Sequence, residues 1–214
     1  MEELETKDKI LKGAESLFMR YGIRSISMDD IARHLAVSKK TLYQHFADKD
    51  ELVTVVTAGH MAASKKMYED IRKQSENSID ELHRIGMHVR RHLEEQNPSV
   101  LFDIQKFHPR AWSVWVEYKN NYIYSSVVRN IKQGIKDGLI RPEINPEIFA
   151  QFRLATIQVC CDEQYFPRDK FNMAEVQSQV FEQFVYGLCT EKGKKLYQKY
   201  KESNHKQLTN TPVI

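Results

Sequence analysis

Residues 39–46 carry polar side chains of the kinds that bind nucleic acid. Drawn as a helix, this stretch turns Leu42 and Phe46 inward and leaves lysine, threonine, tyrosine, glutamine and histidine on the opposite face. The outward residues are Lys39, Lys40, Thr41, Tyr43, Gln44 and His45. None of them is acidic, as is required of a helix that approaches phosphate groups.

A second short helix is expected immediately before this one. It spans residues 28–35, and the three residues 36–38 separate the two, with Val37 at the junction. This spacing fits a helix-turn-helix, whose second helix lies in a major groove. On spacing alone, any short helical hairpin with a polar outer face fits equally well.

The local sequence favours the first alternative. Residues 31–52 read IARHLAVSKKTLYQHFADKDEL. This closely resembles the DNA-binding signature of the tetracycline-repressor (TetR) family, which combines Ile-Ala, a Gly-Val-Ser turn, Thr-Leu-Tyr-x-His-Phe and Lys-x-Glu-Leu. The ungapped resemblance covers residues 7–54. Ala36 replaces the glycine of the turn; if that position needs a positive φ, alanine adds strain of about 1 kcal/mol, which a packed motif tolerates.

The resemblance implies roles for individual residues. Those implied to face base edges are Lys39, Lys40 and Gln44. Those implied to contact the DNA backbone or neighbouring bases are Thr41, Tyr43 and His45. Lys49, in the first turn of the next helix, would bind a phosphate with help from the helix dipole. Ser27 is placed either to donate to a phosphate or to cap the helix that starts at residue 28.

Helical periodicity continues through the rest of the chain, and no segment alternates with period two for long enough to predict a strand. We therefore predict an all-α fold. Helix ends are indicated by Gly22 and Gly138, and helix starts by Asp48 with Glu51, by Ser78 with Glu81, and by Asn145-Pro146. Further helices are expected over residues 98–107, 110–137, 146–164, 173–188 and 190–200.

The predicted organisation is an N-terminal three-helix unit followed by a larger helical domain. We assign residues 1–48 to a helix-turn-helix DNA-binding domain and residues 49–202 to a regulatory and dimerisation domain. Residues 203–214 are polar and are expected to form a disordered tail.

Aromatic residues gather in the second domain. The resemblance implies a small-molecule pocket there, and the candidate lining residues are Phe102, Phe107, Trp112, Trp115, Tyr118, Tyr122 and Phe152. Trp115, Tyr118 and Tyr122 share one helix face. Plain core packing explains the same spacing.

The resemblance also implies dimerisation through the last two long helices, 146–164 and 173–188. The candidate interface residues are Phe149, Arg153, Ile157, Val176, Val180, Phe184 and Gly187. Two copies would form a four-helix bundle that buries both stripes. The alternative is that these stripes pack only within one chain.

Composition excludes several other classes of protein. The net charge is only +3, so any nucleic-acid argument rests on local placement. The three cysteines, Cys160, Cys161 and Cys189, have no CxxC spacing, and the histidines form no ligand set, so neither a metal nor another cofactor is expected. The acidic N-terminus is unlike a signal peptide, and no apolar run could span a membrane.

These observations favour a cytoplasmic, ligand-responsive transcriptional regulator rather than an enzyme. It would act as a repressor, binding a palindromic operator in double-stranded DNA as a homodimer and responding to a small-molecule effector. A helical enzyme and a protein-interaction module without DNA binding are the alternatives. No catalytic triad, phosphate loop or paired carboxylates support the former, and the lysines at the reading position argue against the latter.

Overall fold

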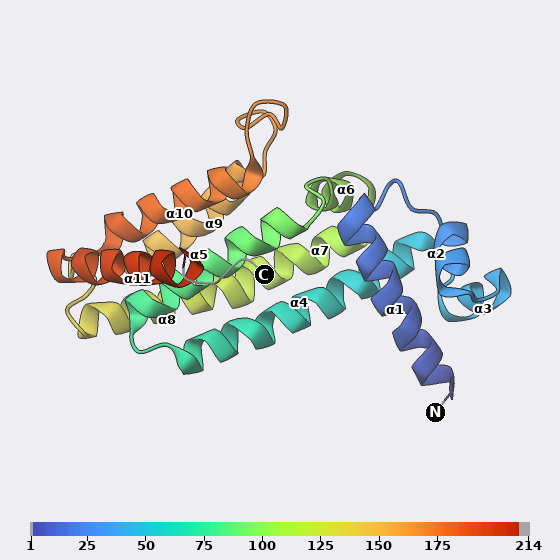
Figure 1. Ribbon diagram of the computed structural model, residues 1–214, viewed down its shortest axis with the longest axis horizontal. Coiled ribbons are helices and arrows are strands. Elements are labelled where there is room, and N and C mark those ends of the chain that lie inside the picture. The colour runs from blue at the N-terminus through green and yellow to red at the C-terminus, as the bar shows by residue number, and fades with distance from the viewer. Residues whose placement is uncertain (1, 210–214) are drawn as a thin grey trace. The chain divides into compact units, whose positions relative to one another are not determined.

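The computed structural model describes residues 2–209, and the side chains of residues 4–203 within that range. These residues form helices joined by short connections, which confirms the predicted all-α fold (Figure 1). The helices are α1 (Glu2–Tyr21), α2 (Met28–Leu35), α3 (Lys39–His45), α4 (Lys49–Gln74), α5 (Ser78–Glu95), α6 (Val100–Phe107), α7 (Pro109–Tyr118), the π-helical η1 (Lys119–Ile123), α8 (Tyr124–Lys136), α9 (Pro146–Cys160), α10 (Met173–Leu188) and α11 (Glu191–Thr209). None of the described helices is both long and apolar enough to cross a membrane.

The chain divides into two compact units. The first contains Met1–Lys66 and His92–Asn120, and the second contains Met67–Arg91 and Asn121–Ile214. Helices α6 and α7 therefore belong to the first unit, together with α1–α3, although the domain boundary predicted from sequence lies at residues 48 and 49. Each unit has its own apolar core.

The core of the first unit fixes the positions of α2 and α3. Ile10, Phe18 and Ile31 are buried beside Leu42 and Phe46, with exposures between 0 and 1%. Gly22, with φ of 82°, ends α1 as expected for a left-handed C-terminal residue. The chain then turns so that α2 packs against α1, and α3 packs against α2.

Most helix ends follow from local side-chain chemistry. Asn145 caps α9 by accepting a hydrogen bond from the Ile148 amide at 3.0 Å. Gly138, with φ of 67°, follows α8. Helix α5 starts at Ser78 as predicted, but its cap is Asn77, whose side chain accepts from the Ile79 and Asp80 amides at 3.0 Å. Amide oxygens cap as well as hydroxyl groups do.

Three helices differ in length from the expectation. The helix predicted over 110–137 is interrupted by the π-helical turn η1, where Asn120 and Asn121 are weak helix formers. Helix α9 ends at Cys160 rather than at residue 164, and α11 continues to Thr209, past residue 203 where a disordered tail was predicted. Residues 210–214 of that predicted tail lie outside the described residues.

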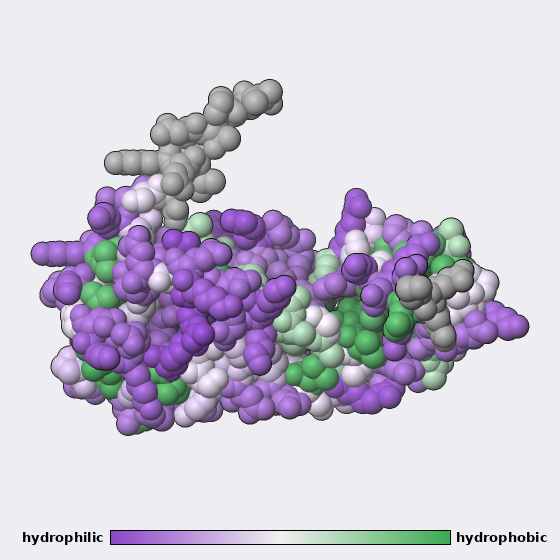
Figure 2. Space-filling view, turned by 90° about the horizontal axis from the view of Figure 1, so that it is seen from below, coloured by the Kyte–Doolittle hydropathy of each residue, from purple (hydrophilic) through white to green (hydrophobic). Residues whose placement is uncertain are grey.

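In the second unit, α9 packs against both α8 and α10 (Figure 1). The core of this unit contains the buried residues Ile131, Ile140, Val185 and Leu188. Figure 2 shows one molecular face that is mostly hydrophilic and interrupted by separate hydrophobic patches.

Candidate nucleic-acid interface

The turn between α2 and α3 contains a backbone conformation that favours glycine. Ala36 has φ of 52° and ψ of 42°, in the left-handed region. The next amide, of Val37, donates to the carbonyl of Ala32 at 3.0 Å and closes the end of α2. The positive φ considered from the sequence is therefore present, and alanine bears the strain.

Capping and burial hold α3 in place from its inner side. Ser38 accepts from the Thr41 amide at 2.9 Å, and the hydroxyl groups of the two residues lie 2.7 Å apart. Leu42 is fully buried and Phe46 is 1% exposed. The remaining face of this two-turn helix is therefore directed away from the core.

That outer face carries the residues predicted to contact DNA. Lys39, Lys40, Tyr43 and Gln44 are exposed, and Tyr43 keeps half of its surface accessible although it is aromatic. Thr41 and His45 are half-buried at the edges. The first turn of α3 contains no acidic residue. The structure thus brings together six of the eight predicted residues on one helix.

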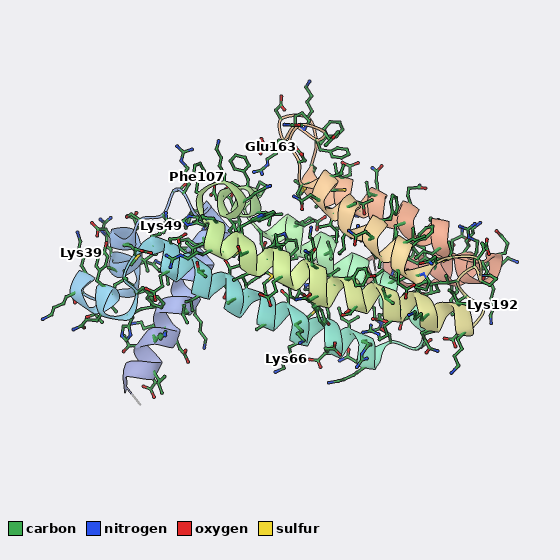
Figure 3. All side chains as sticks on the ribbon, turned by 180° about the vertical axis from the view of Figure 1, so that it is seen from behind. Lys39, Lys49, Lys66, Phe107, Glu163 and Lys192 are labelled. Carbon is green, nitrogen blue, oxygen red and sulfur yellow. The ribbon has the colours of Figure 1, made fainter. Side chains whose placement is uncertain are left out.

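Lys39 forms an ion pair across the motif. Its Nζ lies 2.5 Å from Asp29 Oδ2, and both side chains are largely exposed. Figure 3 shows Lys39 at the outer side of the α2–α3 pair. Because exposed ion pairs contribute little free energy, this lysine can exchange Asp29 for a phosphate or a base edge at small cost.

The other two predicted residues, Lys49 and Ser27, already have partners. Lys49 Nζ donates to the Ile23 carbonyl oxygen at 2.7 Å, and burial lowers the pKa of this lysine against the opposing effect of Asp103 and Asp30. The Ser27 hydroxyl accepts from the Asp30 amide at 3.1 Å and donates to the Asp30 carboxylate at 2.5 Å. The hydrogen bond from the Ser27 hydroxyl, together with one from the Ser27 amide at 3.0 Å, lowers the pKa of the Asp30 carboxyl. Ser27 therefore caps α2, the second of its two predicted roles.

One cluster beside the motif carried no sequence signal. Asp50, in the first turn of α4, pairs with His108 Nδ1 at 2.9 Å and with Arg110 Nε at 2.6 Å. The partners lie 58 and 60 residues away in sequence, at the start of α7. They fasten α7 to α4, the helix that follows α3, within the first unit.

The seven aromatic residues predicted to line a ligand pocket do not gather at one place within either unit. Phe102 and Phe107 form an edge-to-face pair in the first unit, with ring centres 6.4 Å apart, and Phe107 is 42% exposed. Trp112 packs against the core of that unit. Trp115 and Tyr118 lie 6.1 Å apart along α7.

Tyr122 and Phe152 belong to the second unit. The Tyr122 hydroxyl donates to Glu69 at 3.2 Å. Phe152 is 53% exposed, and its ring lies 6.2 Å from that of Phe149 and 6.5 Å from that of Phe184. Phe152 therefore lies among the residues predicted for the dimer interface.

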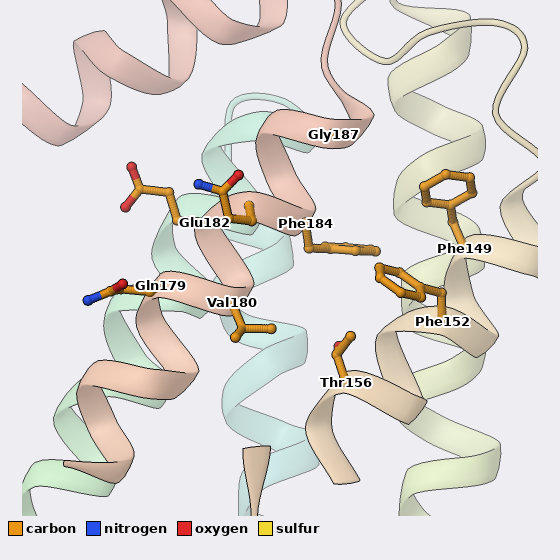
Figure 4. Close-up of a pocket in the computed structure, with 9 residues that line it drawn as sticks. Phe149, Phe152, Thr156, Gln179, Val180, Glu182, Phe184 and Gly187 are labelled. Atoms are coloured by element: carbon orange, nitrogen blue, oxygen red, sulfur yellow. The ribbon is translucent and has the colours of Figure 1, made fainter. Parts of the chain in front are cut away.

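A groove runs between α9 and α10 in the second unit (Figure 4). It has a volume of about 610 Å³ and is lined by Phe149, Phe152, Thr156, Gln179, Val180, Glu182, Gln183, Phe184 and Gly187. Four of the seven predicted interface residues line it. The apolar side chains Ile148, Phe152 and Val159 are exposed on α9, at 63, 53 and 42%, and Ile148 and Val159 were missing from the prediction.

The other three predicted interface residues lie elsewhere. Arg153 and Val176 are only 6 and 8% exposed, because they are buried within the chain itself. Ile157 is half-buried.

Comparison with known proteins agrees with this geometry. Residues 10–56 match the family model described as "Bacterial regulatory proteins, tetR family". Residues 10–56 therefore form a DNA-binding domain of the TetR family. The match contains α2, α3 and the first turns of α4, which are the parts that present and fix the polar face.

Two curated relatives extend the similarity along the chain. The uncharacterized HTH-type transcriptional regulator YvaF of Bacillus subtilis is 25% identical over 168 residues, covering 78% of this chain and 87% of YvaF. The HTH-type transcriptional repressor KstR2 of Mycobacterium tuberculosis is 24% identical over 149 residues, covering 68% and 74%. The chain is accordingly a helix-turn-helix transcriptional regulator and not an enzyme, as predicted.

Solved structures show the same fold. The KstR2 structure from M. tuberculosis superposes with a TM-score of 0.59 at 23% identity, covering 87% of this chain and 96% of KstR2. The regulator FadR of B. subtilis, solved in complex with stearoyl-CoA, superposes with a TM-score of 0.61 at 17% identity, covering 84% and 98%.

Proposed function

We propose that this TetR-family regulator is a repressor that binds a palindromic operator as a homodimer and releases it when a small molecule binds. The outer face of α3 carries the proposal. Lys39, Lys40, Tyr43 and Gln44 are exposed there, while Leu42 and Phe46 hold the helix to the core. Exposed lysine and glutamine side chains on a groove-sized helix suit guanine and adenine edges.

A single α3 of two turns reads only a few base pairs, so specificity requires two copies. A symmetric dimer would place the two reading helices in successive major grooves, about 34 Å apart, on an inverted repeat. The apolar groove between α9 and α10, with Phe152 exposed beside it, supports this homodimer.

In this proposal, the binding of a small molecule is coupled to the equilibrium between two arrangements of the protein. A small molecule shifts the population toward the arrangement that it binds more tightly, and only by that difference in affinity. The complex of FadR with stearoyl-CoA supports an effector for this fold class. We place this activity in the cytoplasm, where operator DNA is found.

Selection of bound duplexes from a random DNA library tests the proposal. We expect enrichment of an inverted repeat with half-sites one helical turn apart, and loss of that enrichment when Lys40 and Gln44 are both replaced by alanine. Enrichment of no sequence, together with retention of another protein by the same α3 face, would support a protein-interaction module instead.

A further inference from the structure

Arg153, on α9, is a buried cation without an acidic partner. The side chain is 6% exposed, and its Cζ lies 4.7 Å from the ring centre of Phe181 and 5.9 Å from that of Phe184, both on α10. Its hydrogen bond, from Nη1 to Thr156 Oγ1, is long at 3.4 Å. Arg153 forms no ion pair with any carboxylate of the described residues.

Other arginines of the same unit are neutralised. Arg84 pairs with Asp80 at 2.9 Å, and Arg129 pairs with Glu81. A buried charge is costly unless it is paired and hydrogen-bonded. Burial lowers the pKa of Arg153 only to about 10, so the guanidinium remains positive at neutral pH.

A second proton donor on another helix interacts with Arg153. Tyr68, on α4, interacts electrostatically with Arg153, and its hydroxyl forms no hydrogen bond with any residue that the structure describes. Burial raises the pKa of Tyr68 to about 12, so the phenol keeps its proton at neutral pH. The second unit thus holds Arg153 against the rings of Phe181 and Phe184, with the phenol of Tyr68 near enough to interact with its charge.

We propose that Arg153 and Tyr68 bind the carboxylate of a small amphipathic acid whose apolar part packs against Phe181 and Phe184. The proposal rests on the proposed function, since this acid would be the effector of the regulator. A guanidinium and a phenol can donate to the two oxygens of one carboxylate with charge assistance.

The charge at the site selects a monoanion. The other titratable groups that act on Arg153 are the thiols of Cys160 and Cys161, and burial raises the pKa of both, to about 11 for Cys161. Both thiols are therefore neutral at neutral pH, and the guanidinium is left as a single positive charge. One carboxylate neutralises it, whereas a phosphate dianion would leave a negative charge buried in its place.

The test measures binding of n-alkanoates from hexanoate to tetradecanoate to the full-length chain, by thermal shift and tryptophan fluorescence. The 1-alkanols and alkyl phosphates of the same lengths are the comparison ligands. We expect at least one alkanoate to bind about tenfold or more tightly than its alcohol, because a hydrogen bond to a charged group is stronger than one to a neutral group. Arg153→Met and Tyr68→Phe should reduce this preference, and the exposed Lys195→Met should leave it unchanged.

Equal binding of alkanoates and alkanols by the wild type would overturn the proposal. So would an unchanged preference in Arg153→Met. Tm without ligand separates a binding role from a packing role, since replacing an unpaired buried charge by methionine should keep or raise Tm. A lower Tm of Arg153→Met together with dissociation into monomers would assign Arg153 to packing and overturn the proposal. If Arg153→Met does not fold, the preference for alkanoates over alkanols is measured in Tyr68→Phe and Arg153→Lys instead.

A gel shift with operator DNA keeps the two proposals distinct. Wild type that binds operator but shows no carboxylate preference overturns the effector class alone. Wild type that binds carboxylates through Arg153 but binds no operator retains the site and overturns the proposed function.

Discussion

Lys49 Nζ donates a hydrogen bond to the carbonyl oxygen of Ile23, 2.7 Å away, and so joins the first turn of α4 to the connection between α1 and α2. Figure 3 labels this lysine near the start of α4. The family resemblance implies a phosphate contact for the same side chain. An ammonium group has three protons, so Lys49 can keep Ile23 and still donate to a phosphate.

Lys49→Met should therefore have two separable effects. We expect weaker binding to operator and scrambled duplex alike, with the magnitude of the salt slope lowered by about 1 per half-site, because one phosphate contact is lost. The free energy of unfolding should also fall by about 1 kcal/mol with the lost hydrogen bond. Fluorescence anisotropy at several salt concentrations measures the first effect and urea unfolding the second. The exposed Lys66→Met is the control. An unchanged salt slope in Lys49→Met would show that Lys49 makes no phosphate contact.

Substitutions on the outer face of α3 should affect DNA binding in a different way. Lys40→Ala and Gln44→Ala should each cost about 1–3 kcal/mol on the operator and relax the preference at the base that each one reads. Tyr43→Phe removes a hydroxyl and keeps the ring, so a loss of affinity there isolates one hydrogen bond. Titration of each variant against single-base operator variants is the measurement. If Lys40→Ala and Gln44→Ala keep both affinity and preference, α3 does not read DNA.

Ala36 provides a test of backbone strain. Ala36→Gly should stabilise the chain by up to about 1 kcal/mol, because glycine adopts φ of 52° without the clash of a Cβ, and the greater entropy of the unfolded glycine offsets part of the gain. Ala58→Gly, exposed within α4, should destabilise by about 1 kcal/mol. Urea unfolding of both variants should give opposite signs; destabilisation by both would show that Ala36 bears no relevant strain.

The sequence could predict those features that depend on residues close together in the chain. Ser27 and Asn145 each cap the helix that their positions predicted, because a cap involves residues three apart. The outer face of α3 followed from the same short-range periodicity. The pairing of Asp50 with His108 could not be predicted, since nothing in a single sequence links side chains 58 residues apart.

The same limit explains the outcome for Arg153. Its position on α9 placed it on a stripe with Phe149, but helix periodicity does not say which of two neighbouring faces meets α10. The structure buries it beside Phe181.

The Asp50 cluster should make stability depend on pH. Burial alone would raise the pKa of Asp50, but hydrogen bonds from His108 and Arg110 outweigh it and hold the pKa below 3.8. A depressed carboxyl pKa stabilises the folded state above the unfolded pKa, and this contribution is lost as the pH falls through the folded value. Asp50→Asn should therefore lower the free energy of unfolding at pH 7 by about 1 kcal/mol and by progressively less below pH 3.8. Urea unfolding from pH 7 to 3 measures this difference; a constant difference over that range would contradict the assignment.

The dimer is best tested at Phe152 rather than at the centre of the predicted stripe. Phe184 is only 4% exposed within a single chain, so a charge there would disrupt the fold whether or not a dimer forms. Phe152 is 53% exposed and lines the groove between α9 and α10 (Figure 4). Phe152→Glu should leave the helical content unchanged and produce monomers, because an unpaired carboxylate is costly in a buried interface.

Phe171→Glu, at a ring that is 46% exposed outside the groove, is the matched control and should remain dimeric. Sedimentation equilibrium at micromolar concentration gives the association state. Loss of the dimer in Phe152→Glu should also lower operator affinity, since each half-site would then be bound separately. A wild-type monomer, or a Phe152→Glu dimer as stable as the wild type, would show that this face packs no second copy.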